Sequence, residues 1–273
     1  MSAPADPVRP FAPACERNQA PILDVLRRHL GGGERVLEIA SGTGQHALHF
    51  TQQLPELRWQ CSDLPDRLAG IRQWLADGDG RRLPAPLPLD ALEGQWPPGR
   101  FDAVFTANSF HIMPWAGVQG VFRRIAEVLE PDGSLIVYGP FRVGGDFVAE
   151  SDARFDDSLR QRDPDMGLRD LERVDELARA SGLGLVEHCP RGLKSLGDRQ
   201  DIARPAAVER DPRQGPGHVR GAFQRLAQTF AHDFVFKKEG NAVEPVLDRI
   251  HIDQRSGQAA GEQAFSGPCR PYH

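Results

Sequence analysis

The turn Ser41-Gly42-Thr43-Gly44 has the residue types of a ligand-binding loop. It follows a short apolar run, Val36, Leu37, Ile39 and Ala40, and precedes a helix-compatible run that starts near Gln45. Glycine adopts positive φ without steric cost and lets a ligand approach the backbone closely. The first N–H groups of the following helix have no partner within that helix and point toward the turn. This strand, turn and helix order predicts a site for an anionic or polar ligand.

Two carboxylates follow at the ends of the next predicted strands. Asp63 lies 19 residues beyond Gly44, an interval at which a carboxylate accepts hydrogen bonds from ribose hydroxyls. The run Ser62 to Pro65 also fits a helix N-terminus, and both roles are compatible. Asp90 follows a predicted strand at 87–89, where a carboxylate either faces an adenine ring or only forms a turn.

A third group of polar residues follows the apolar strand predicted at 101–107. His111 is the best candidate for a general base because histidine titrates near neutral pH; a hydrogen bond to the backbone is the alternative role. Asn108 either orients the amine or hydroxyl of a substrate or ends the turn. The histidines His46, His49 and His111 are joined by no carboxylate at metal-ligand spacing, so no metal site is predicted.

Strands and helices alternate along the chain. Apolar periodicity predicts helices at 17–30, 66–76, 115–129 and 168–180, and strands at 35–40, 57–61, 87–89, 101–107, 134–138 and 183–187. Residues 141–166 have little periodicity and many charges. The alternation predicts an α/β fold with a doubly wound, mostly parallel Rossmann-like sheet. Its ligand crevice would lie beyond the carboxyl ends of the strands, with Gly42 opposite Asn108.

Composition narrows the partners and the location. The net charge is −5 over 273 residues, which gives no reason to expect nucleic acid or a membrane surface as the main partner. We find no signal peptide and no apolar run long enough to span a bilayer. The four cysteines form no C-x-x-C pair and are typical of thiols in a reducing compartment. We therefore expect a cytoplasmic protein.

Several blocks of sequence carry a family resemblance. They are RPFAPACERNQAPIL, VLEIASGTGQHALHF, WQCSD, FDAVFTANSFHIMPW, LIVYGPF and ESDARFDDSLRQRDPDMGLRD. With these blocks the chain resembles class I S-adenosylmethionine-dependent methyltransferases, and more narrowly an uncharacterised methyltransferase-like family, over about residues 9–188.

The resemblance implies an enzyme that transfers a methyl group from S-adenosyl-L-methionine to a small-molecule acceptor. Matched positions imply the cofactor site: Glu38, Ala40, Gly42 and Gly44 around the methionine part, Asp63 on ribose, Asp90 near adenine, and Arg17 and Asn18 closing the site. An acidic residue late in the first strand, here Glu38, is typical of these enzymes. Ala40 stands where many of them have glycine. Tyr138 and the polar residues of 150–160 either line the acceptor pocket or form a solvated face.

The family-like part is expected to end near residue 190. We interpret residues 1–190 as the methyltransferase domain and 191–273 as an atypical tail, poorly ordered or foreign to the family. Within the tail only 223–236 and 246–252 have the composition of ordered elements, so the seventh strand of related sheets is not predicted.

Two other functions remain open. An NAD(P)-dependent oxidoreductase would use the same glycine turn and Asp63, but it leaves Glu38 unexplained, and no Tyr-x-x-x-Lys pair follows the central strands. A non-catalytic protein that binds S-adenosylmethionine is the other, favoured if the atypical tail spoils the acceptor side.

Overall fold

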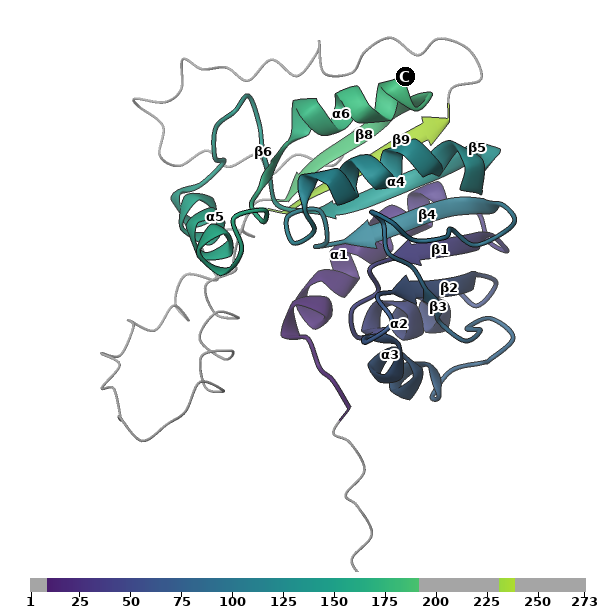
Figure 1. Cartoon of the computed structure of the whole chain (residues 1–273). Helices are drawn as coiled ribbons and strands as arrows, with labels where there is room; N and C mark the ends of the chain where they lie inside the picture. The colour runs from purple at the N-terminus through teal and green to yellow at the C-terminus, as the bar shows by residue number, and fades with distance from the viewer. Residues whose placement is uncertain (1–8, 192–230, 239–273) are drawn as a thin grey trace, which may run out of the picture.

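The computed structural model describes residues 9–191 and 231–238, which form a seven-stranded sheet between two layers of helices (Figure 1). In spatial order the strands are β3 (Leu87–Pro88), β2 (Arg58–Asp63), β1 (Arg35–Ile39), β4 (Phe101–Ala107), β5 (Leu129–Gly139), β9 (Ala231–Lys238) and β8 (Leu183–Arg191). The pairs from β3 to β5 are parallel, and β9 is antiparallel to both of its neighbours. The predicted Rossmann-like α/β fold is confirmed.

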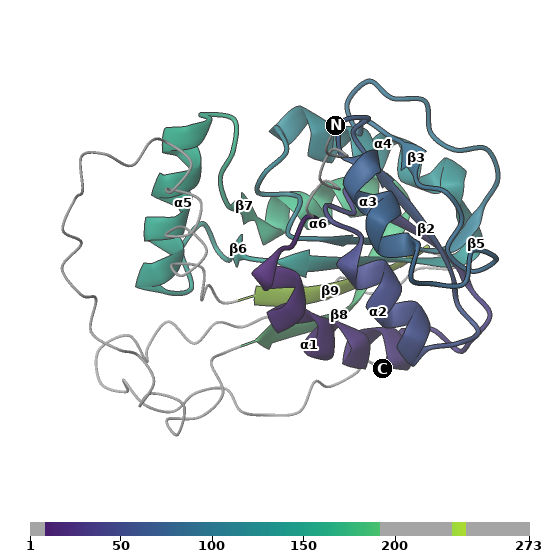
Figure 2. The same ribbon diagram turned by 90° about the horizontal axis from the view of Figure 1, so that it is seen from below.

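Helices cover both faces of the sheet (Figures 1 and 2). One apolar core contains side chains of α1 (Pro13–His29), α2 (Gln45–Gln53) and α3 (Leu68–Leu75), and the other those of α4 (Trp115–Val128) and α6 (Leu171–Ala180). Four of the five residues of β1 are buried, as expected for a strand covered on both sides. This double burial explains why the central strands appear in the sequence as apolar runs.

The order of the strands reverses at β1. This strand pairs with β2 on one side and with β4 on the other, so the connections leave it in opposite directions. A crevice opens at such a switch point beyond the carboxyl ends of the strands. The predicted position of the ligand site therefore coincides with the observed topology.

A helix and a small sheet lie beyond those strand ends. Helix α5 (Glu150–Arg162) stands apart from the other helices in both ribbon views, next to the two-stranded sheet of β6 (Phe141–Arg142) and β7 (Arg169–Asp170). The sequence predicts no element here, because two of the three buried residues of α5 are carboxylates, Asp152 and Asp156. Apolar periodicity is absent from a helix whose inner face is polar.

Several predicted boundaries are shifted. Helix α1 begins at Pro13 instead of residue 17, and proline fits there because the first helical N–H groups need no partner within the helix. Strand β5 begins at Leu129, five residues before its predicted start. Helix α6 begins at Leu171, three residues after its own predicted start.

Strand β9 comes from the segment that the sequence assigned to the atypical tail. It pairs with β5 through Ile136 and Val235 and with β8 through Leu185 and Phe236. The described part of this segment therefore completes the sheet, which corrects the expectation of a missing seventh strand. The other segment expected to be ordered, 246–252, lies outside the described residues, and the domain boundary near residue 190 stays a prediction.

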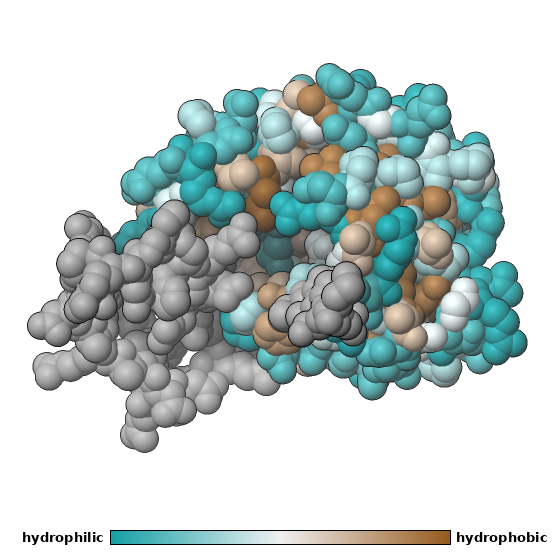
Figure 3. Space-filling view, turned by 60° about the horizontal axis from the view of Figure 1, so that its bottom comes forward, coloured by the Kyte–Doolittle hydropathy of each residue, from teal (hydrophilic) through white to brown (hydrophobic). Residues whose placement is uncertain are grey.

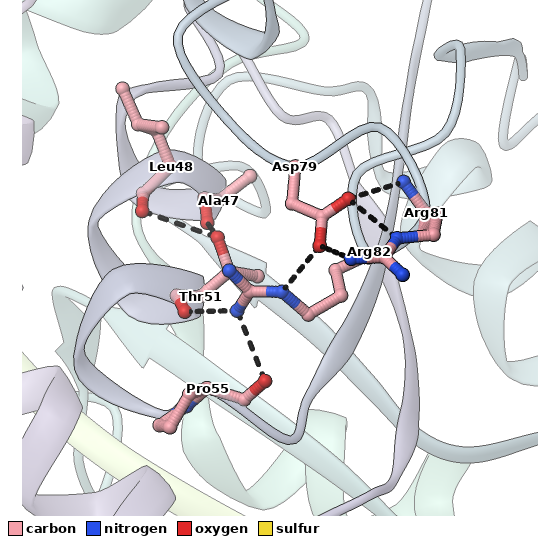
Figure 4. Close-up of polar contacts among 7 residues, drawn as sticks. All are labelled: Ala47, Leu48, Thr51, Pro55, Asp79, Arg81 and Arg82. Carbon is pink, nitrogen blue, oxygen red and sulfur yellow. Dashed lines mark hydrogen bonds and ion pairs between the residues drawn. The ribbon is translucent and has the colours of Figure 1, made fainter.

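Arg82 braces the far end of α2 (Figure 4). Its guanidinium donates hydrogen bonds to the carbonyl oxygens of Thr51, at 2.5 Å, and Pro55, at 3.1 Å, and to the Asp79 carboxylate at 3.4 Å. The Thr51 hydroxyl in turn donates to the Ala47 carbonyl at 2.8 Å. These bonds fix the helix whose first turn faces the crevice.

Truncation of β9 tests its place in the sheet. Phe234 is fully buried, and its ring meets that of Phe141 edge to face with centroids 4.9 Å apart. We expect Phe234→Ala to lower the free energy of unfolding by about 3–5 kcal/mol in urea titrations. The exposed Lys237 on the same strand provides the control, and Lys237→Ala should change stability by less than about 0.5 kcal/mol. Equal stabilities of the two variants would show that β9 lies outside the core.

Candidate functional site

The turn between β1 and α2 leaves the sheet through a series of left-handed backbone conformations. Ala40, Gly42 and Gly44 have φ values of 55°, 62° and 87°. A Cβ atom on Gly44 would lie 3.1 Å from the Cγ2 atom of Ile71 on α3, so a side chain fits poorly there. Ala40 adopts this conformation at an energetic cost that glycine would not incur, and such strain is common at functional sites.

Strand β2 holds the turn in place. The Gly42 N–H donates to Oδ2 of Asp63 at 2.7 Å, and the Leu64 N–H donates to Oδ1 at 2.7 Å. The Ser41 N–H donates to the Ser62 carbonyl at 3.0 Å. Burial raises the pKa of the Asp63 carboxyl, while the two backbone donors act in the opposite direction. Asp63 thus lies at the glycine turn, and its contact with ribose hydroxyls stays a prediction.

Glu38 lies beneath the turn, inside the protein. Its side chain is 2% exposed, and its Oε2 atom accepts a hydrogen bond of 2.9 Å from the Trp59 indole N–H. Desolvation raises the pKa of this carboxyl to about 7. The carboxyl therefore bridges β1 and β2 below the loop, and its predicted contact with a cofactor stays a prediction.

The first turn of α2 offers donors to a ligand. The N-cap residue is Gly44, which has no side chain to cap the helix, and the Gln45 N–H makes only a long bond of 3.4 Å to the Thr43 hydroxyl. The Gln45 side chain points elsewhere: its Oε1 atom accepts from the Thr43 hydroxyl at 2.9 Å and from the Ala12 N–H at 2.6 Å. Helix N-termini of this kind attract anionic groups.

The start of α1 borders the same turn. The Cys15 thiol is hydrogen-bonded to Thr43, and burial raises its pKa to about 11, so it stays protonated. Arg17 is exposed and Asn18 half-buried on the turns that follow. The two predicted site-closing residues thus belong to the helix that contacts the glycine turn, and their contact with a ligand stays a prediction.

Asp90 follows β3 on the other side of Asp63. Its Oδ1 atom accepts a hydrogen bond of 2.8 Å from the Leu92 N–H, and the Leu89 N–H donates to the Asp63 carbonyl at 2.9 Å. The turn role considered for Asp90 is thus present in the structure. One carboxylate oxygen, Oδ2, has no hydrogen bond within the described residues.

Sequence reasoning missed two apolar side chains beside these carboxylates. Leu64 and Leu92, which follow Asp63 and Asp90 closely, are 44% and 43% exposed. Hydrophobic patches also interrupt the hydrophilic surface on the face shown in Figure 3. Exposed leucines next to polar groups suit a ligand with a flat apolar ring. The only available signal was their position directly after the strand ends.

Asn108 and His111 lie at the end of β4. Asn108 has a left-handed conformation, φ 53°, and its N–H donates to the Tyr138 carbonyl at 2.8 Å. His111 is 5% exposed, and its ring meets Phe155 of α5 at a centroid distance of 5.4 Å. Desolvation, followed by the charge of Arg169, lowers the pKa of His111 to about 3, so the ring is neutral at physiological pH. Its role as a base stays a prediction.

Arg169, which sequence reasoning missed, fixes the loop that carries these two residues. Its guanidinium donates to the carbonyl oxygens of Phe110 at 2.9 Å, Met113 at 2.6 Å and Asp165 at 2.7 Å. The Gly167 N–H donates to the His111 carbonyl at 3.0 Å. The segment between α5 and α6 therefore holds the loop after β4 from outside the sheet.

A pair of histidines lies farther along the same edge of the sheet. His188 Nε2 and His232 Nδ1 are 2.9 Å apart, and His232 pairs with Gly139 at the carboxyl end of β5. Burial lowers the pKa of His188 to about 4 and that of His232 to about 3, so both rings are neutral. This pair is not predicted from the sequence, because the two histidines are 44 residues apart and His232 lies in the segment assigned to the tail.

Residues 9–191 and 231–238 contain neither a group of side chains that could hold a metal ion nor a helix that could cross a membrane. No three His, Cys, Asp or Glu side chains in this part of the chain are grouped so that they could hold a metal ion. No helix in it combines the length and the apolar character needed to cross a bilayer.

A family model matches residues 9–191, two thirds of the chain, and includes every site residue described above except His232. The chain belongs to the DUF938 family, whose members are proteins of unknown function. The family match includes both the glycine turn and the loop after β4, and it ends at the last residue of β8.

Three solved structures with a similar fold are named as methyltransferases. An O-methyltransferase family protein from Burkholderia thailandensis has a TM-score of 0.59 and 16% identity over 84% of this chain and 59% of its own. A putative sarcosine dimethylglycine methyltransferase from Galdieria sulphuraria has a TM-score of 0.57 and 17% identity over 83% of this chain and 87% of its own. A putative methyltransferase from Bacillus halodurans has a TM-score of 0.52 and 16% identity over 81% of this chain and 99% of its own.

These likenesses establish the fold of the DUF938 chain as that of class I methyltransferases. The identities are too low to transfer an activity. The chain spans 59% of the Burkholderia protein and 54% of mitomycin 7-O-methyltransferase, so it matches little more than half of each.

The raised pKa of Glu38 predicts a pH dependence of stability. Its carboxyl titrates near 4.5 when unfolded and near 7 when folded. The stability that it contributes is therefore complete below about pH 4.5 and is lost as the pH rises through 7. We expect wild type to lose stability relative to Glu38→Gln between pH 5 and 8 in urea titrations, because the amide does not ionise. A constant difference between the two proteins over this range would contradict the prediction.

Proposed function

We propose that this protein is an S-adenosylmethionine-dependent methyltransferase that acts on a small-molecule acceptor. The observation that carries the proposal is the hydrogen bond from Gly42 to Asp63, which lies beside a first turn of α2 without a side-chain cap. One carboxylate, one glycine turn and a helix N-terminus without a side-chain cap thereby meet at the switch point of the sheet. A nucleoside carrying an amino-acid group fits this combination.

The residues present suit each part of the cofactor. A Cβ atom on Gly42 would have no neighbour within 4 Å, so the turn is open on the side where the amino-acid part would bind. The first N–H groups of α2 would receive its carboxylate. Asp63 would accept from the ribose hydroxyls, and Asp90, with Leu64 and Leu92, would hold the adenine. Glu38 would support the turn from below.

Methyl transfer makes limited demands on the protein. The cofactor supplies an activated methyl group on a sulfonium, and the reaction is an in-line displacement by the acceptor. The chain would align the acceptor, exclude water and, where needed, take up a proton. Asn108 would orient the acceptor, and His111, neutral and next to Phe155, would accept a hydrogen bond or a proton from it.

Two alternatives from the sequence have less support. An NAD(P)-dependent oxidoreductase would also use the glycine turn and Asp63, but the solved structures that resemble this fold are named as methyltransferases. A non-catalytic protein that binds S-adenosylmethionine would have the same cofactor site without turnover. Strand β9, from the segment assigned to the tail, completes the sheet instead of disrupting it, which favours the enzyme. A cytoplasmic location stays a prediction.

Calorimetric titration with S-adenosylmethionine, S-adenosylhomocysteine and NAD tests the proposal. We expect micromolar dissociation constants for the first two ligands and no measurable heat from NAD. Asp63→Ala should weaken binding at least about tenfold, because it removes a charged hydrogen-bond acceptor. Asp66→Ala is the matched control: Asp66 is an exposed carboxylate three residues away that pairs only with Arg67 at 3.5 Å.

The outcomes separate the candidate functions. Binding of NAD alone would replace the methyltransferase by the oxidoreductase. If Asp63→Ala and Asp66→Ala change the dissociation constant equally, Asp63 does not contact the ligand. Where S-adenosylmethionine binds as expected, production of S-adenosylhomocysteine with candidate acceptors distinguishes the enzyme from a non-catalytic binding protein.

A further inference from the structure

Residues 9–12, here called the strap, lie across helix α3 just before α1 begins. The guanidinium carbon of Arg9 is 3.5 Å from the centroid of the Trp74 ring, a cation–π contact. The Trp74 indole N–H donates to the Pro10 carbonyl at 2.6 Å, and the Phe11 ring lies 6.5 Å from that of Trp74. Three consecutive strap residues therefore contact one side chain of α3.

The surface of α3 is shaped to receive the strap. A Cβ atom on Gly70 would lie 2.7 Å from the Cγ atom of Pro10, so a larger residue there would displace the strap. Arg9 also forms an ion pair with Asp77, with 2.5 Å between Nη1 and Oδ2. Both side chains of the pair are partly exposed, so the pair alone contributes little. The combination of ring, carbonyl and proline contacts holds the strap.

The other end of the strap is bonded to the glycine turn. The Ala12 N–H donates to the Oε1 atom of Gln45 at 2.6 Å, and the same atom accepts from the Thr43 hydroxyl at 2.9 Å. Gln45 is 8% exposed and is the first residue of α2. Its amide is thus the link through which a displacement of the strap reaches the turn.

Docking of the strap has an opposing cost. The Nε and Nη2 atoms of Arg9 are buried and have no hydrogen-bond partner among the described residues. Donors buried in this way lose hydration without replacement, which offsets part of the gain from the contacts with Trp74. These two donors therefore reduce the net stabilisation that the strap gains from its contacts on α3.

We propose that the strap and Gln45 are positioning elements of the cofactor site: docking on Trp74 sets the geometry of the turn 41–44 for binding. The inference rests on the proposed function and extends the site to residues 9–12 and Trp74, with the hydrogen bond from Ala12 to Gln45 as the direct link between strap and turn. Preorganisation of the turn lowers the cost of ordering it when a ligand binds. Thermodynamic linkage then requires that a bound ligand stabilises the docked strap by the same factor.

Variants at the far end of the strap test this coupling without altering the turn. Arg9→Gln removes the cation and the ion pair, and Trp74→Phe keeps an aromatic ring but removes the N–H donor. Arg81→Gln is the matched control, because Arg81 pairs only with Asp79 on the exposed loop after α3. The readouts are amide hydrogen exchange of the unliganded protein and the dissociation constant of S-adenosylhomocysteine.

We expect Arg9→Gln and Trp74→Phe to accelerate exchange at residues 9–12 and also at 41–48. They should weaken binding of S-adenosylhomocysteine roughly fivefold or more, while Arg81→Gln matches wild type in both measurements. In wild type, saturating S-adenosylhomocysteine should slow exchange at 9–12.

Faster exchange confined to 9–12, with unchanged exchange at the turn and unchanged binding, would overturn the inference. Absence of binding by folded wild type would instead refute the proposed function. In that case exchange at 41–48 in the unliganded variants still decides whether the strap positions the turn. A loss of binding that follows only from a lower melting temperature is recognised because it would appear in thermal denaturation of the same variants.

Discussion

The hydrogen bonds between β2 and the turn after β1 are the interaction on which the rest of the site depends. These bonds stabilise the left-handed backbone conformations of Ala40 and Gly42. The Asp63 carboxylate accepts a hydrogen bond from the Gly42 N–H, and the Glu38 carboxyl, beneath the turn, accepts one from the Trp59 indole N–H. The same contacts direct the first turn of α2 toward the crevice. The conformation of the turn and its attachment to the sheet thus depend on the same side chains, so a change at Asp63 affects both.

The opposite wall of the crevice is built differently. Its loop after β4 takes its position from hydrogen bonds to Arg169 and Gly167, which belong to the segment beyond α5. The side chains that face this wall, His111 and the His188–His232 pair, are neutral because burial lowers their pKa. This wall therefore depends on packing and on hydrogen bonds from Arg169, whereas the side with the glycine turn depends on oriented backbone donors and one carboxylate.

Much of the glycine turn and of the strands around it could be predicted from the sequence, because their residues follow local rules. A glycine turn needs glycine, and the parallel strands that carry it need continuous apolar runs. Boundaries were less certain: β5 and α1 begin several residues before their predicted starts. Helix α5 was not predicted because its buried face carries Asp152 and Asp156. The role of Arg169 was not predicted because its hydrogen-bond partners are backbone carbonyls. A hydrogen bond to a distant carbonyl leaves no pattern in the sequence.

The sequence by itself determined the alternation of strands and helices, the turn at 41–44 and the carboxylates that follow the strands, since each depends on neighbouring residues. The tertiary structure decided that 231–238 completes the sheet, that Glu38 lies beneath the turn, and that residues 9–12 reach it through Gln45. These features join segments far apart in the chain. Their contacts form only when the whole sheet assembles, because the energy that favours them comes from burial shared by several elements.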